Sequence, residues 1–236
     1  MVGTTADDAE VCPLPPAPVT REVVSDHPIF TESIRRIRVL LGDTGLDALQ
    51  QQVLERLVHS SGDPGLAPLL RFSDGACERG LAALKAGAAI LTDTAMAAAA
   101  VSPMARRTGA NAVCGLLDWA PDRAPEGSTR SAAAMAQAWR ALTTQAEAAG
   151  QPMPLVLVGS APTALEQLID QLEAGAPAPS LVIGMPVGFV GVPESKRRLA
   201  STDLAQIRLE GTRGGAGLVG AACNALLRAA ALEGQG

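Results

Sequence analysis

Aromatic side chains are scarce in this sequence. Its 236 residues include two Trp, three Phe and no Tyr, so a core must be built from Ala, Leu, Val and Ile. Hydrophobic residues make up 47% of the chain and charged residues 18%, which is typical of a globular protein rather than a disordered one. A chain of this length is most simply one domain of ordinary size.

Metal-binding residue types are also few. The two histidines, His27 and His59, cannot form a histidine-rich metal site. The four cysteines lie far apart and form no CxxC pair: Cys12, Cys77, Cys114 and Cys223. We therefore expect buried free thiols in a reducing compartment, with no metal and no cofactor.

The sequence also lacks an excess of positive charge and long apolar runs. The net charge of -5 argues against a nucleic-acid partner, because phosphate binding needs a basic field. A few local Arg residues can nevertheless hold a small anionic substrate. No run of 18 uncharged apolar residues occurs and no secretory signal is visible, so we expect no membrane span and a cytoplasmic protein.

The chain divides into a leader and one folded unit. Residues 1–26 are acidic and rich in Pro, which predicts a flexible leader, and residues 27–236 form the domain. Apolar periodicity and stop signals predict helices over 29–41, 46–58, 74–86, 128–149, 164–172 and from 217 to about 230. Short apolar runs predict strands over 88–91, 112–117, 155–158 and 181–184.

Apolar strands alternating with helices define the fold class. Continuous apolar strands joined by helices indicate a mostly parallel sheet that is covered on both faces. We therefore predict an α/β protein, a three-layer α/β/α domain. Ligands in such folds bind at the carboxyl ends of the strands. The loops there carry Thr94, Ser160, Thr163 and Gly188, and a Gly-rich segment over 211–217 carries Arg213.

A nucleotide site is weakly signalled. The segment over 211–217 is neither G-x-G-x-x-G nor a P-loop, because no Gly-Lys-Ser/Thr follows it. A nucleotide-dependent α/β enzyme is thus a remote alternative, although the following helix could still bind a phosphate at its N-terminus.

His59 is the main candidate for acid–base chemistry. From its position at a predicted helix end, a capping or core role is the commoner outcome. His is, however, the side chain that titrates near neutral pH, and His27 lies only at the edge of the domain. Asp63 or Asp93 could partner His59, but capping of a helix or turn is the favoured reading of both.

Arg130 is a candidate for binding a carboxylate. It stands at the start of a predicted helix, where a positive charge opposes the helix dipole. The alternative is a solvated Arg at a helix end.

Several ordered segments of the sequence together match one family pattern. The most distinctive is residues 184–191 (GMPVGFVG) with Glu194-Ser195-Lys196. The others, in order from about residue 29 to the C-terminus, are Val58-His59, 92–96 (TDTAM), 128–133 (STRSAA), 161–165 (APTAL) and 211–217. In these segments the sequence resembles the precorrin-8X methylmutase family. This resemblance implies a homodimeric isomerase of cobalamin biosynthesis that moves a methyl group between adjacent ring C carbons of the tetrapyrrole precorrin-8X or its cobalt form.

The resemblance also assigns roles to residues. It implies that His59 is the catalytic acid, that Ser33 contacts the substrate and that Thr129 and Arg130 form the substrate-binding Thr-Arg pair. With these we group Thr94, Ser160, Thr163, Gly188 and Arg213 as substrate-binding residues. A methyl shift needs a shaped macrocycle and one placed proton, so the small number of catalytic residue types fits this chemistry.

The sequence departs from the family pattern at four places. Ser128 and Ser160 stand where the family has Asn, residues 97–100 are Ala where it has a Gly-containing turn, and Ala216 replaces a Ser. These changes motivate an alternative: a diverged corrinoid-binding or carrier protein without catalysis. The retention of His59 argues for the enzyme, because a carrier needs no acid.

Overall fold

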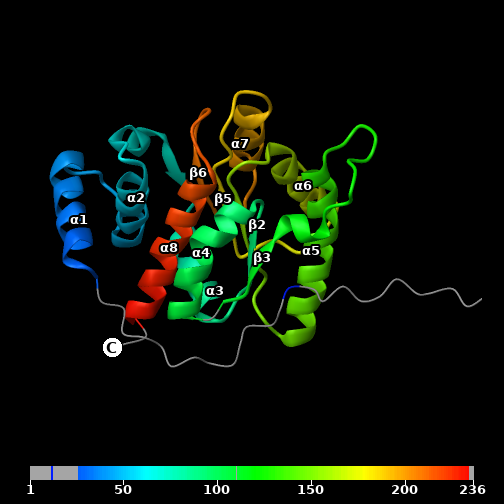
Figure 1. Ribbon diagram of the computed structural model, residues 1–236, viewed down its shortest axis with the longest axis horizontal. Helices are drawn as coiled ribbons and strands as arrows, with labels where there is room; N and C mark the ends of the chain where they lie inside the picture. The colour runs from blue at the N-terminus through cyan, green and yellow to red at the C-terminus, as the bar shows by residue number, and fades with distance from the viewer. Residues whose placement is uncertain (1–11, 13–25, 110, 234–236) are drawn as a thin grey trace, which may run out of the picture.

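A single six-stranded sheet organises the molecule (Figure 1). The computed structural model describes residues 12, 26–109 and 111–233. The strand order is β1-β6-β5-β4-β2-β3, and all neighbouring strands are parallel except β1, which is antiparallel to β6. The strands are β1 (Leu70–Phe72), β2 (Ile90–Thr92), β3 (Val113–Gly115), β4 (Leu155–Val158), β5 (Leu181–Gly184) and β6 (Gln206–Leu209). The predicted α/β class is confirmed.

The central strands are apolar throughout because both faces of the sheet are covered. Every residue of β4 and β5 is buried, and Leu155 is paired with Leu181 across them. Successive side chains alternate between the faces. Leu155 and Leu157 enter one core, whereas Val156 and Val158 enter a second core on the other face.

Helices cover both faces, as the three-layer prediction requires. One face carries α3 (Ala76–Lys85), α4 (Ala95–Thr108) and α8 (Ala216–Glu233), and the other carries α5 (Arg130–Ala149), α6 (Pro162–Glu173) and α7 (Val192–Ala200). Two further helices lie outside α8: α2 (Ala48–Ser61) packs on α8, and α1 (Pro28–Leu41) packs on α2 (Figure 1). Two 3₁₀-helices complete the fold, η1 (Pro64–Leu69) and η2 (Leu116–Trp119).

Several elements differ from the predictions. The Ala residues at 97–100 do not fill a turn but form the first part of α4, which Thr94 caps by accepting a hydrogen bond from the Ala97 N–H at 3.1 Å. The strand predicted over 112–117 is only Val113–Gly115, because the chain turns into η2. The elements β1, α7 and β6 were not predicted, since their short or charged sequences carry little periodicity.

The expectation of four free thiols is wrong for two of them. Cys12 forms a disulfide with Cys114, with their Cα atoms 5.5 Å apart, while Cys77 and Cys223 are free and buried. Cys114 lies in β3, the edge strand, so a segment before the domain can reach it. The separation of 102 residues hides this pairing from the sequence, because only the fold brings the two thiols together. Residues 1–11 and 13–25 of the predicted leader lie outside the described residues.

Helix α8 is the one described helix that is long and apolar enough to cross a membrane. In the fold it is a core helix: 61% of it is buried, and it packs against α2, α3 and α4. Its hydrophobicity is thus explained by its central position.

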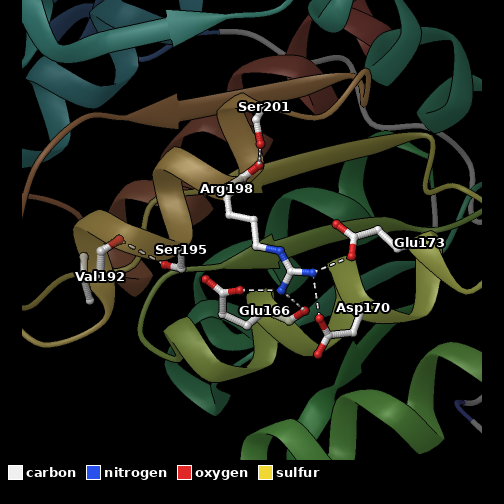
Figure 2. Close-up of polar contacts among 7 residues, drawn as sticks. All are labelled: Glu166, Asp170, Glu173, Val192, Ser195, Arg198 and Ser201. Atoms are coloured by element: carbon white, nitrogen blue, oxygen red, sulfur yellow. Dashed lines mark hydrogen bonds and ion pairs between the residues drawn. The ribbon is translucent and has the colours of Figure 1, made fainter.

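An ion-pair network fixes α7 to α6 (Figure 2). The Arg198 guanidinium lies 2.6 Å from Glu166, 2.7 Å from Asp170 and 2.8 Å from Glu173. These three carboxylates raise the pKa of Arg198. The network positions the helix that follows the loop over 185–191.

Candidate active site

His59 lies in the last turn of α2 and is held by α1. Its Nδ1 is 2.8 Å from the Ser33 Oγ, so the two helices are joined at this pair. Helix α2 ends because Gly62 adopts a left-handed conformation with φ 67°, which glycine tolerates without strain. The structure therefore brings together Ser33 and His59, two of the residues predicted for the site.

The surroundings of His59 disfavour its charged form. Phe30 of α1 packs edge-on against the imidazole, with ring centroids 5.1 Å apart. Partial burial, and secondarily the charge of Arg56, lower the pKa of His59 from its ordinary value.

A cavity of about 620 Å³ adjoins His59. It lies between the end of α2, one side of α8 and the second half of α4. Residues from these helices and the chain before α1 form its lining: Asp26, His27, Phe30, Arg56, His59, Ser60, Ala100, Met104, Arg107, Gly217, Ala221, Asn224 and Arg228. A space of this size suits an organic ligand much larger than a metabolite of a few atoms.

Three arginines of this lining were missed by the sequence predictions. Arg56 lies three residues before His59, a spacing that places two helical side chains on one face, so a signal existed. Arg228 is a lone positive charge in the apolar helix α8, which is a second usable signal. Arg107 comes from the charged end of α4 and had no comparable signal.

A second group of predicted residues lies at the carboxyl ends of β2 and β4. The buried Asp93 accepts hydrogen bonds from the Ser160 N–H at 2.6 Å and the Ala161 N–H at 2.8 Å. Burial nevertheless raises the pKa of Asp93, because it outweighs these N–H donors. Thr129 Oγ1 lies 2.7 Å from Thr163 Oγ1, which links the start of α5 to the start of α6.

The favoured structural readings of both aspartates are confirmed. Asp93 organises the loop after β4. Asp63 caps η1 and pairs with Arg213 at 3.0 Å. In the described structure, the hydrogen-bond partner of His59 is Ser33.

Arg130, Gly188 and Arg213 are placed by neighbouring loops. The exposed Arg130 donates its Nε–H to the Pro121 carbonyl at 2.8 Å. The Gly188 N–H donates to the Thr212 carbonyl at 3.1 Å, so the family-like loop over 184–191 contacts the Gly-rich segment. Lys196, which is buried, holds that segment by donating to the carbonyls of Gly211 at 3.0 Å and Arg213 at 2.5 Å.

The predicted site residues thus form two groups. The first comprises Ser33 and His59, which contact each other, and of these two His59 lines the cavity. The second comprises Thr94, Thr129, Arg130, Ser160, Thr163, Gly188 and Arg213, which are absent from the cavity lining.

The sequence matches the precorrin-8X methylmutase family model over residues 28–229. The chain belongs to the precorrin-8X methylmutase family. It is therefore an isomerase of cobalamin biosynthesis.

Individual members of the precorrin-8X methylmutase family agree with this assignment. The precorrin-8X methylmutase of Pseudomonas aeruginosa is 41% identical over 203 residues, covering 84% of this chain and 93% of the relative. The cobalt-precorrin-8 methylmutase of Synechocystis is 33% identical, covering 89% and 98%. Among solved structures, the precorrin-8x methyl mutase of Thermus thermophilus has a TM-score of 0.73 and 39% identity, covering 87% of this chain and 97% of that one.

Proposed function

We propose that this isomerase moves a methyl group between adjacent ring C carbons of precorrin-8X, or of its cobalt form, and that protonated His59 starts the shift. The observation that supports this most is His59 itself: it is hydrogen-bonded to Ser33 beside a cavity of about 620 Å³ that three arginines line. A tetrapyrrole with several carboxylates suits this mixture of cationic and apolar lining.

In the proposed reaction, Ser33 orients the acid. When the imidazole is protonated, its Nδ1–H donates to the Ser33 Oγ, and the Nε2–H is the proton available for transfer. Transfer to the conjugated ring withdraws electron density from ring C. The methyl group then migrates with its bonding pair to the adjacent carbon, and a proton returns to His59. Substrate and product have the same composition, so the step needs no redox partner.

Because the pKa of His59 is lowered in the free enzyme, substrate binding is proposed to favour protonation of this acid. In the free enzyme burial and the charge of Arg56 disfavour the charged imidazole and lower its pKa. Substrate carboxylates that bind beside Arg56 would offset its charge and favour the imidazolium. The acid would thus form chiefly in the complex.

We also propose a homodimer in which both chains line each site. None of the eight predicted substrate-binding residues is in the lining of the cavity at His59, so a second chain could bring such residues to it. Exposed apolar side chains that a partner could cover include Val39 and Leu40 on α1 and Phe189 and Val190 after β5. Light scattering should give a mass of twice 24.0 kDa, and a monomer at micromolar concentration would contradict the dimer.

The proposed activity is tested by offering the purified protein precorrin-8X and cobalt-precorrin-8 and following the visible absorbance. We expect conversion of at least one to the matching product, hydrogenobyrinate or cobyrinate. Binding of product without conversion would instead favour the carrier alternative that the changes at Ser128 and Ser160 motivate. A cytoplasmic location remains part of the proposal.

A further inference from the structure

Arg56 is a partly buried cation without a partner of opposite charge in contact with it. Within the described part of the chain, its guanidinium makes no hydrogen bond and no ion pair, and it lies 4.8 Å from the centre of the Phe30 ring. Burial, and then the charge of Arg228, lower the pKa of Arg56. A desolvated charge of this kind is costly unless an anion joins it.

Arg228 lies beside Arg56 and already holds a carboxylate. Its Nε–H donates to Asp26 Oδ1 at 2.9 Å, and its second nitrogen contacts the other Asp26 oxygen. The two contacts form the forked geometry in which arginine binds carboxylates. The Arg228 guanidinium is 5.9 Å from the centre of the Phe30 ring, so Phe30 is shared by Arg228, Arg56 and His59.

The charges of the two neighbouring arginines do not balance within the described lining. Arg56 and Arg228 supply two positive charges, and Asp26, the one acidic residue of that lining, supplies one negative charge. Asp26 directly precedes His27, the cap of α1. The first-turn hydrogen bonds of α1 are made to His27 and not to Asp26, so the Asp26 carboxylate can leave Arg228 without breaking them.

We propose that Arg56 and Arg228 form a carboxylate-binding subsite beside His59, and that Asp26 occupies its Arg228 half until a ligand carboxylate replaces it. This inference rests on the proposed function, which supplies a substrate with several carboxylates. Asp26 is then an internal competitor of the ligand. It keeps Arg228 paired in the free protein. Because the Asp26–Arg228 pair must break before a ligand carboxylate can bind Arg228, the free energy of that pair weakens ligand binding. Arg56 makes no direct ion pair with Asp26 in the described structure and interacts with its charge only at longer range.

The test measures the binding of hydrogenobyrinate to the full-length chain by visible absorbance. We expect Asp26→Asn to bind about tenfold more tightly, because the competing charged hydrogen bonds are gone. We expect Arg56→Met to bind at least about tenfold more weakly. Arg140→Met, on the exposed face of α5, and Asp203→Asn, before β6, are matched controls that should bind as the wild type does.

Two further arms separate the subsite from general effects on folding. The gain in Asp26→Asn should vanish when it is combined with Arg228→Met, because the released guanidinium is then missing. Product with its carboxylates esterified should bind the wild type and Asp26→Asn equally. The Asp26→Asn arm also keeps the test informative if Arg56→Met melts at a lower temperature, since tighter binding cannot come from misfolding.

The outcomes are distinguishable. If the wild type converts neither precorrin-8X nor cobalt-precorrin-8 and binds neither product, the proposed function is overturned, and the subsite with it. If the wild type converts one of them and binds its product, but Asp26→Asn binds that product no more tightly than Asp203→Asn, or folded Arg56→Met binds it as tightly as Arg140→Met, the subsite alone is wrong.

Discussion

At the scale of single residues, the catalytic assignment depends on the contact between Ser33 and His59. The Ser33 Oγ of α1 lies 2.8 Å from the His59 Nδ1 of α2, and this contact fixes the orientation of the imidazole. Ser33→Ala should leave the fold intact but let the imidazole ring rotate. We therefore expect kcat to fall by about tenfold, because one hydrogen bond of about 1 kcal/mol or somewhat more is lost. Ser33→Thr, which retains a hydroxyl, should recover much of the rate. Stopped-flow absorbance would measure this, and an unchanged kcat in Ser33→Ala would show that the contact does not orient the acid.

The lowered pKa of His59 predicts a pH dependence with a definite sign. The protonated form is the active one, so kcat/KM, which reports the free enzyme, should fall as pH rises through a value below 6.5. The charged or titratable groups facing the same cavity are Arg56, Arg107, Arg228, Asp26 and His27.

Removal of one cation tests the cause of this shift. Arg56→Met should move the midpoint of kcat/KM to higher pH, because a positive neighbour is lost, while Arg140→Met should not. A midpoint above 6.5 in the wild type, or one that stays fixed in Arg56→Met, would contradict the assignment of the titrating group to His59.

At the scale of elements, the network around Arg198 should stabilise the α6–α7 contact. Arg198→Met leaves three carboxylates close together, so we expect the free energy of unfolding to fall by about 1 kcal/mol, more than for an isolated surface pair. Arg197→Met is the matched control on the same helix, because Arg197 pairs only with the exposed Glu194 in the described structure. Urea unfolding would compare them, and equal midpoints would show that the network adds nothing.

The elements predicted most accurately from the sequence are the central strands, whose apolar pattern follows from burial in the sheet. Strands β4 and β5 were predicted with the bounds that the structure has, because burial on both faces demands continuous apolar residues. Helix α4 was missed because its Ala-rich start shows no polar face. Helix α7 was missed because it is short and its buried face includes the polar residues Ser195 and Lys196. Tertiary packing, rather than local pattern, decides both.

Site residues could be predicted from the sequence where their residue type is rare. They could not be predicted where their hydrogen-bond partners come from distant segments of the chain. His59 stood out because the chain has only two histidines. The pairing of Arg228 with Asp26 joins residues 202 positions apart, and only the packing of α1, α2 and α8 brings them together.

At the scale of the whole molecule, the Cys12–Cys114 disulfide ties the segment before the domain to the edge strand β3. Cys12→Ser should lower the free energy of unfolding by about 2–4 kcal/mol under oxidising conditions, as expected for a cross-link over a long loop. Reductant should lower the stability of the wild type by a similar amount and leave Cys12→Ser unchanged. If reductant affects both equally, the cross-link is not the cause.

The boundary at residue 27 remains a prediction. A chain that begins at His27 should keep its fold, because the described core residues other than Cys12 lie after residue 27. Its stability should be no higher than that of Cys12→Ser, because it also lacks the Asp26–Arg228 pair. It should also retain conversion of precorrin-8X.

The central claim, that the His59 proton starts the methyl shift, is tested most directly by single-turnover conversion of precorrin-8X by His59→Ala. The variant should fold and still bind hydrogenobyrinate, since the arginines of the cavity remain. Its conversion should be at least about a hundredfold slower than that of the wild type, the lower end for general acid catalysis. A rate within a few-fold of the wild type, in a variant that melts normally and binds the product, would mean that the proton comes from another group.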